Sequence, residues 1–443
     1  MKRSTIRVIA SAILMTVASF AAGCGGADNP VAPTPPAPGF AQITVRSAVD
    51  SSLVANSNVV LYRAETNEAV LRGLTGVDGT ISFSVSAGNY YLNISAQGFN
   101  SVPLENITPI PFFVAWENLV AQDVLLDVHP DAGGTGYVLG FVDPTINSFL
   151  ILAESQATQS KYHTASGPDG FFVLFNLPYG TYQMDALKSG FKMVSPVSAT
   201  ISSQTDVDSI GIQVTDYQGS TLTGSVTFLA SQNAVVDITL LDPETRAVIP
   251  GLTVLSDATG LNYTIDGIPD GAYIAWASLR NDGYVIDPDW LFKNPGGLDI
   301  VFATAETKQL DFSVTDVTTL VSPTNPADNT IPAMANSQVP IFRWLPYPSA
   351  KEYFIEVRNF DGNVLWGGVN SNGTVNHAFI GAAADSAIYN FDNQQNVPAL
   401  VPGEVYQWRL WADKGTQADS FVEQLISSSE DLRGVFQVPD SSP

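Results

Sequence analysis

A repeat of about 90 residues dominates this sequence. Three times, an Asp-Gly or Thr-Gly turn is followed by a Gly-x-Tyr element and then by a glycine-aromatic pair. The turn glycines are Gly79, Gly170 and Gly260, at successive distances of 91 and 90 residues. Because repetition at a fixed period is typical of tandem structural units, the spacing predicts three copies of one small fold.

Apolar residues alternate in the segments around these turns. In the first copy, Tyr90, Leu92 and Ile94 fall on one face of a strand. Glycine in the turn supplies the positive φ that a tight hairpin requires. About seven short strands in each copy, separated by turn signals, predict a small antiparallel β-sandwich. The predicted fold class is therefore all-β, built from tandem small antiparallel β-sandwiches.

The order of turn glycine, alternating strand, Gly-x-Tyr, alternating strand and Gly-Phe or Gly-Tyr resembles the carboxypeptidase regulatory-like, transthyretin-like family. The resemblance implies three such sandwiches, at residues 40–130, 131–217 and 218–317. In that family the domain accompanies peptidases, adhesins and outer-membrane transporters as a structural module. The related Cna B-type stalk domains carry a Lys to Asn or Asp isopeptide bond. Residues 24–160 contain no lysine, so we expect these modules to hold by packing alone.

A different pattern begins after the third copy. Trp344 stands in an early strand, and a Leu-x-Pro-Gly-x-x-Tyr corner ends at Tyr406. These elements resemble a fibronectin type III sandwich, which implies a fourth, fibronectin type III-like or immunoglobulin-like domain at residues 318–443. The resemblance implies that the corner tyrosine hydrogen-bonds back to the chain upstream. A long insert, roughly 367–397, departs from the family pattern.

The N-terminus has the pattern of an export signal. Residues 1–23 combine a basic head with an apolar run, Val8 to Phe20, which is too short to span a bilayer. Small residues then precede Cys24, and this arrangement resembles the bacterial lipoprotein signal. The resemblance implies a lipid on Cys24, a Pro/Gly-rich tether at residues 24–39, and, from Gly25, an outer-membrane or cell-surface location. Ordinary secretion with a chance cysteine is the alternative.

Charge and composition exclude several classes of function. The chain has 43 acidic and 19 basic residues, a formal net charge of −24, so binding to nucleic acid is not expected. One cysteine cannot form an internal disulfide, and three scattered histidines make a poor metal cage. The sequence has no Gly-rich phosphate loop, nucleophile elbow or Cys-His pair. We therefore expect no enzyme activity, no metal site and no cofactor.

Paired acids leave two alternatives open, the acid and base of a glycosidase and a calcium site. The acidic pairs Asp206/Asp208 and Asp287/Asp289 are expected to lie in solvated loops, as are the Asp361-Gly-Asn363 and Asp392-Asn393 segments. Calcium binding is one alternative interpretation of such turn-borne carboxylates.

Tryptophan side chains are the best candidates for ligand binding, because an exposed ring can stack on a sugar or anchor a protein partner. The candidate residues are Trp290, Trp366 and Trp411, the last of which is expected to face away from the core. Trp344 and Trp408 are predicted to be core residues. Trp116 is predicted to pack its loop against its own domain, with the ring buried.

The preferred interpretation is a non-enzymatic, lipid-anchored surface protein that acts as a spacer, an adhesion protein or a protein-binding module. The N-terminal lipid would attach this protein to the membrane. The sequence does not identify its protein or glycan partner. The first alternative is a glycan-binding accessory lipoprotein of an outer-membrane uptake system. A secreted hydrolase of unrecognised type is a further alternative.

Overall fold

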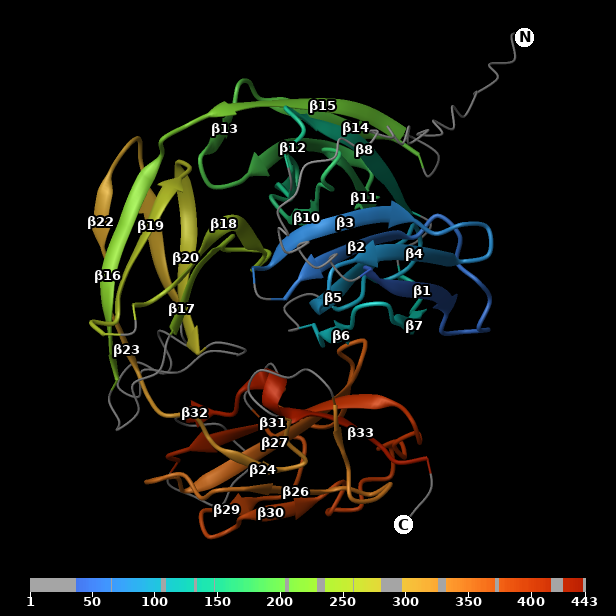
Figure 1. Ribbon diagram of the computed structural model, residues 1–443, viewed down its shortest axis with the longest axis vertical. Coiled ribbons are helices and arrows are strands. Elements are labelled where there is room, and N and C mark those ends of the chain that lie inside the picture. The colour runs from blue at the N-terminus through green and yellow to red at the C-terminus, as the bar shows by residue number, and fades with distance from the viewer. Residues whose placement is uncertain are drawn as a thin grey trace, which may run out of the picture. The chain divides into compact units, whose positions relative to one another are not determined.

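The computed structural model describes residues 37–440 except 65, 105–108, 131–133, 147, 204–206, 229–235, 258, 280–296, 326–331, 371–373 and 416–424. Within these residues the regular elements are β-strands and one short 3₁₀ turn, η2 (Asp431–Gly434), so the predicted all-β class with tandem small sandwiches is confirmed (Figure 1). No helix in this part of the chain is long and apolar enough to cross a membrane. The predicted signal peptide, Cys24 and the tether up to residue 36 lie outside the described residues.

The first repeat forms two sheets that share one core. Their strand orders are β4-β1-β7 and β3-β2-β5-β6. Along β1, buried and more exposed residues alternate, so Ala41, Ile43 and Val45 reach the core. The strands are β1 (Gly39–Ser47), β2 (Asn58–Arg63), β3 (Glu68–Leu74), β4 (Thr80–Val85), β5 (Gly88–Ser95), β6 (Phe112–Val114) and β7 (Leu119–Leu126).

The second repeat has the sheets β11-β8-β15-β13 and β10-β9-β12-β14. Its strands are β8 (Thr135–Asp143), β9 (Leu150–Ser155), β10 (Lys161–Ala165), β11 (Phe171–Pro178), β12 (Gly180–Leu187), β13 (Phe191–Met193), β14 (Val197–Ile201) and β15 (Val207–Asp216).

The third repeat has the sheets β19-β16-β22, with β23 also on β16, and β18-β17-β20-β21. Its strands are β16 (Ser220–Phe228), β17 (Val236–Leu241), β18 (Val248–Leu255), β19 (Asn262–Ile268), β20 (Gly271–Leu279), β21 (Gly297–Phe302), β22 (Thr307–Gln309) and β23 (Phe312–Val314).

Strand pairing differs from the predicted all-antiparallel sandwich at the same place in every copy. The first strand of each repeat is antiparallel to one neighbour but parallel to the last strand of that repeat. The parallel pairs are β1 with β7, β8 with β15, and β16 with β22 and β23. Parallel neighbours cannot be joined by a hairpin, so each sandwich is closed by a pair whose members are far apart in sequence.

The tyrosine of each Gly-x-Tyr element has the same buried position in all three copies. Tyr90, Tyr182 and Tyr273 each donate their hydroxyl to the backbone carbonyl four residues earlier, on Ser86, Pro178 and Pro269, at 2.9, 2.5 and 2.8 Å. A buried hydroxyl needs such a partner. The repeated motif therefore fixes the turn that leads into β5, β12 and β20.

The turn glycines follow the prediction in two copies. Gly79 and Gly170 have φ of 65° and 74°, which confirms their positive-φ role. The expectation is wrong for Gly260, because in the third copy Leu261 takes the left-handed conformation, with φ of 52°. The Asp257 carboxylate accepts hydrogen bonds from the backbone N–H groups around this turn, which holds the shifted geometry.

The fourth sandwich has a three-stranded sheet, β24-β26-β30, and a larger sheet that runs β25-β33-β31-β27-β28, with β29 on β27 and β32 on β31. The strands are β24 (Leu320–Ser322), β25 (Ala333–Met334), β26 (Ile341–Trp344), β27 (Glu352–Asn359), β28 (Val364–Gly367), β29 (Ile380–Gly381), β30 (Ser386–Ile388), β31 (Val405–Asp413), β32 (Leu425–Ser428) and β33 (Val435–Gln437).

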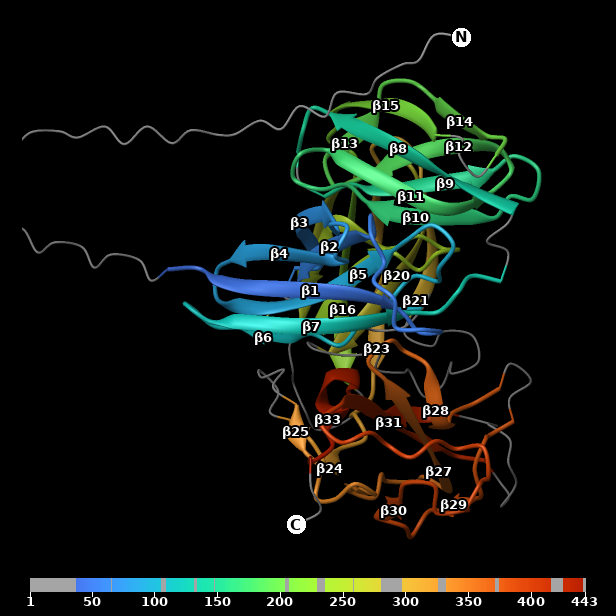
Figure 2. The same cartoon turned by 90° about the vertical axis from the view of Figure 1, so that its right-hand side faces the viewer.

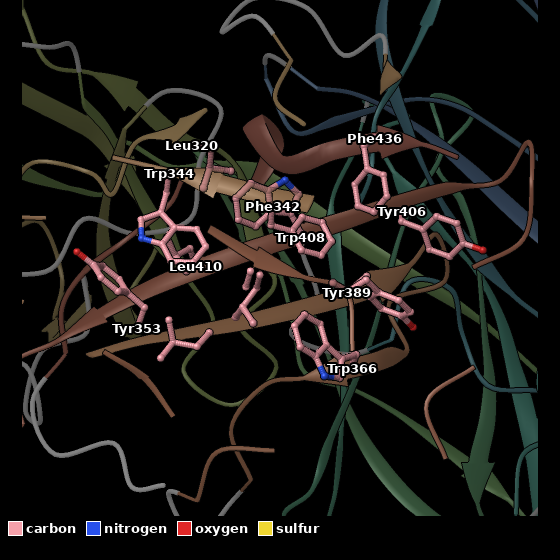
Figure 3. Close-up of a cluster of buried hydrophobic side chains, with 14 of the residues drawn as sticks. Leu320, Phe342, Trp344, Tyr353, Trp366, Tyr389, Tyr406, Trp408, Leu410 and Phe436 are labelled. Carbon is pink, nitrogen blue, oxygen red and sulfur yellow. The ribbon is translucent and has the colours of Figure 1, made fainter. Parts of the chain in front are cut away.

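The core of the fourth sandwich is aromatic (Figure 3). Trp344 and Trp408 are buried in it, as predicted. The Trp408 indole N–H donates to the Pro323 carbonyl at 2.7 Å. Tyr406 also forms its predicted bond to the upstream chain, since its hydroxyl accepts from the Val401 N–H at 2.8 Å. Trp116 of the first sandwich is 45% exposed, so the prediction that its ring is buried is wrong.

Candidate functional site

An open depression of about 550 Å³ lies on the fourth sandwich, beside the end of β28. We call it the β28 depression. Its lining comes from β28 and from two parts of the long insert. The lining residues are Val364, Leu365, Trp366, Gly367, Val375, Asn376, His377, Gln394, Asn396 and Val397.

Two adjacent glycines let the chain turn back at the end of β28. Gly367 and Gly368 have φ of 73° and 79°. A Cβ on Gly367 would lie 2.0 Å from the Ile355 carbonyl oxygen, and one on Gly368 would lie 2.5 Å from the Glu356 carboxylate. Only glycine permits both the conformation and the close approach. The Trp-Gly-Gly sequence is the signal that could have located this turn.

Trp366 forms the floor of the depression. Its side chain is only 2% exposed, and its ring contacts Phe342 and Tyr389 (Figure 3). The ring of Phe391 contacts it as well. The indole N–H donates to the Asp392 carboxylate at 3.3 Å. Trp366 therefore has almost no exposed ring face for stacking, although the residue lines the depression, and its binding role stays an untested prediction.

His377 is a buried lining residue beside Trp366, and both of its ring nitrogens have backbone partners. Nε2 accepts from the Ile355 N–H at 3.0 Å, and Nδ1 lies 2.6 Å from the Ala378 carbonyl oxygen. An N–H group can only donate and a carbonyl can only accept, so the neutral tautomer with hydrogen on Nδ1 satisfies both. Burial lowers the pKa of His377 below its usual value. The imidazole therefore braces the insert against β27.

Asp392 ties the insert to the floor. Besides the Trp366 indole, it accepts hydrogen bonds from the Ala378 N–H at 2.9 Å and from the Gln394 side-chain amide at 2.7 Å. Burial raises the pKa of Asp392, but the hydrogen bonds from Gln394, Ala378 and Trp366 outweigh it, so the pKa lies below its usual value. An ionised carboxylate with three donors has a structural role.

The rim of the depression consists of amide side chains. Asn376 and Asn396 are exposed, and Gln394 is half-buried. Asn376 is held by a reciprocal amide pair with Asn370, at 2.7 and 3.1 Å. The residues that line the depression include no Asp, Glu, Lys or Arg. This arrangement can donate and accept hydrogen bonds, but it offers no free general acid or base.

Trp411 lies on the sheet face opposite the core, as predicted, but it is covered. The ring packs with Phe354 and Val375 and is 7% exposed. The Arg409 guanidinium stands 4.8 Å from the ring centre. The expected exposure of Trp411 is wrong because the insert carries Val375 across this face. Its binding role stays an untested prediction.

The remaining candidate residues fall outside the described residues. Cys24, Trp290, Asp206, Asp287 and Asp289 have no described position. Among the residues that are described, no group of three or more His, Cys, Asp or Glu side chains could hold a metal ion. Sequence reasoning missed Asn376 and Gln394, for which an insert rich in Asn and Gln was the available signal, and it considered Asp392 only as a turn-borne acid and His377 only as a possible zinc ligand.

No protein-family model and no curated protein matches the chain. Similar solved structures include the Bacillus anthracis TIE protein, at 10% identity over 63% of this chain and 50% of that one, with a TM-score of 0.18. BcpA, the major pilin subunit of Bacillus cereus, is 12% identical over 62% and 99%, with a TM-score of 0.18. The shaft pilin SpaA of Lactobacillus rhamnosus GG is 9% identical over 42% and 99%, with a TM-score of 0.17. The chain thus spans about half the length of TIE, and likenesses of this degree carry no functional argument.

Proposed function

We propose that this chain is a non-catalytic, lipid-anchored surface protein in which three repeated sandwiches space a fourth, partner-binding sandwich from the membrane. Cys24 carries the lipid, and the residues that follow it up to the start of β1 at Gly39 form the tether. The β28 depression on the fourth sandwich is the contact surface for the partner.

The observation that carries the proposal is the construction of this depression. Its floor and walls are fixed by hydrogen bonds to His377 and Asp392, while the Asn376 and Asn396 side chains reach the surface. A preformed concave site with a few polar groups at its edge suits binding, since little conformational entropy is lost when a partner docks. Polar, uncharged groups such as peptide amides match this rim.

The glycan alternative gains no support from two of its candidate platforms, because Trp366 and Trp411 are both more than nine-tenths buried. Stacking on a sugar requires an exposed ring face.

Cell fractionation and deletion test the two halves of the proposal. We expect Cys24→Ser to move the protein from the membrane fraction to the soluble exported fraction. Deletion of residues 318–443 should abolish capture of the partner by intact cells while membrane attachment persists. Membrane attachment that survives Cys24→Ser would exclude the lipid anchor. Unchanged capture after the deletion would exclude the fourth sandwich as the contact domain.

A further inference from the structure

The parallel pairing of first and last strands gives the three repeats a shared mechanical geometry. Eight consecutive residues of β1 are in register with β7, from Phe40 with Leu119 to Ser47 with Leu126. Seven residues of β8 are in register with β15. In the third repeat, β16 has three register positions with β22 and three with β23. Figures 1 and 2 both show β1 beside β7.

When the first and last strands of a sandwich are parallel neighbours, the chain enters the first strand at one end of the pair and leaves the last strand at the opposite end. A pull on the two termini of the sandwich therefore slides the strands past each other along their axes, so the hydrogen bonds between them share the force. In an antiparallel pair that is pulled from one end, the bonds break one after another. Parallel ladders also have evenly spaced bonds, so no single position takes most of the load.

The connection between the second and third repeats leads directly from one such pair into the next. β15 ends at Asp216 and β16 begins at Ser220, so only three residues separate the last strand of the second repeat from the first strand of the third. Tension along the chain must pass through these strands.

Neither a lysine isopeptide bond nor a disulfide can support the first pair. Residues 25–160 contain neither lysine nor cysteine, which leaves no amine or thiol for a bond between strands. Across β1 and β7, Arg46 forms an ion pair with Asp123 at 3.1 Å, but this pair is largely exposed and contributes little. The backbone ladder between β1 and β7 therefore provides most of the resistance to sliding.

We propose that the β1–β7, β8–β15 and β16–β22/β23 pairs are shear clamps that keep the three sandwiches folded under tension. This inference rests on the proposed function, because a chain held by a lipid at one end and a partner at the other is stretched. The structure also predicts the order of the unfolding forces of the three copies. The third clamp is divided between two short strands, so the third sandwich unfolds at the lowest force and the first at the highest.

Single-molecule stretching tests the clamps directly. The lipid-free chain, residues 24–443, is held by the lone thiol of Cys24 and by a C-terminal tag in optical tweezers. Each repeat should unfold in one step of about 30 nm, at roughly 0.36 nm per residue. A Gly/Ser insertion in the exposed turn at Gly260 lengthens the step of the third copy and so identifies it. The third copy should yield at about half the force of the first.

Two proline variants of β7 provide a matched comparison. Phe40 N–H donates to Asn118 O at 2.7 Å, and Ala48 N–H donates to Leu126 O at 2.9 Å. Alternation between these bonds turns the Gln122 N–H toward β1 and the Ala121 N–H toward the open edge of the sheet. Gln122→Pro should therefore lower the unfolding force of the first copy at least twofold, and Ala121→Pro should leave it within measurement error.

Equal forces for Gln122→Pro, Ala121→Pro and the unmodified chain would overturn the proposal. If Gln122→Pro prevents the first sandwich from folding, the order of unfolding forces in the unmodified chain tests the proposal instead. A third copy that unfolds at the same force as the first would then contradict the shear clamps. Either result would leave Cys24-dependent attachment and partner capture unaffected. Failure of the clamps and failure of the proposed function are therefore distinguishable.

Discussion

Removal of one hydroxyl, in Tyr273→Phe, tests whether the repeated Gly-x-Tyr element stabilises each sandwich. The ring remains in place, so no cavity forms. The change deletes the hydrogen bond to the Pro269 carbonyl and leaves that buried carbonyl without this partner. We expect a loss of about 2 kcal/mol, about 1 for the bond and the rest for the unsatisfied acceptor.

The second repeat supplies the comparison. Tyr182→Phe deletes the same bond, but Pro178 is exposed, so water can replace the lost donor and the expected loss is about 1 kcal/mol. Tyr137→Phe, in the same sandwich, serves as the control, since its ring contacts Phe175 and its hydroxyl is not part of the repeated bond.

Hydrogen exchange resolved by mass spectrometry is the suitable assay, because it reports the free energy of opening for each sandwich separately. Peptides from β20 should lose more protection in Tyr273→Phe than peptides from β12 lose in Tyr182→Phe. If both variants lose no more protection than Tyr137→Phe, the hydroxyl of the Gly-x-Tyr tyrosine does not stabilise its sandwich. If Tyr182→Phe loses more protection than Tyr273→Phe, burial of the accepting carbonyl does not determine how much stability is lost.

Three further predictions concern the β28 depression. Because burial lowers the pKa of His377, the imidazole of the unfolded chain becomes protonated at a higher pH than that of the folded chain. The stability of the fourth sandwich should therefore fall as the pH drops below about 6.5. In denaturation measured at several pH values, His377→Gln should flatten this dependence. Gly367→Ala should cost at least about 2 kcal/mol in denaturant unfolding, whereas Gly190→Ala, which has a similar φ and no neighbour within 4 Å, should cost less. Asp392→Asn should accelerate hydrogen exchange at the Ala378 amide, and unchanged exchange would contradict its role as an anchor.

The features that sequence predicts well are those that depend on local periodicity. Alternation placed Trp344 and Trp408 in the core, and the repeat spacing gave the three similar sandwiches. The parallel clamps were not predicted, because strands about 80 residues apart carry no local signal for their mutual direction.

The candidate site was predicted only in part. Alternation correctly placed Trp411 on the face away from the core, but it could not show that the insert brings Val375 onto that face. Likewise, Trp366 follows a strand pattern, yet its burial depends on Tyr389 and Phe391 from the distant end of the insert. Tertiary contacts made by an irregular segment leave no periodic pattern in the sequence.

Blocking the β28 depression is the most direct measurement of the central claim. Asn396→Trp places a large ring at the exposed rim of the depression, and Gln156→Trp places the same ring in an exposed turn of the second sandwich. Capture of the partner by intact cells displaying each variant is then compared with the unmodified protein. The proposed function predicts at least a tenfold loss of capture for Asn396→Trp and none for Gln156→Trp. Equal capture by the two variants would contradict the assignment of the depression as the contact surface.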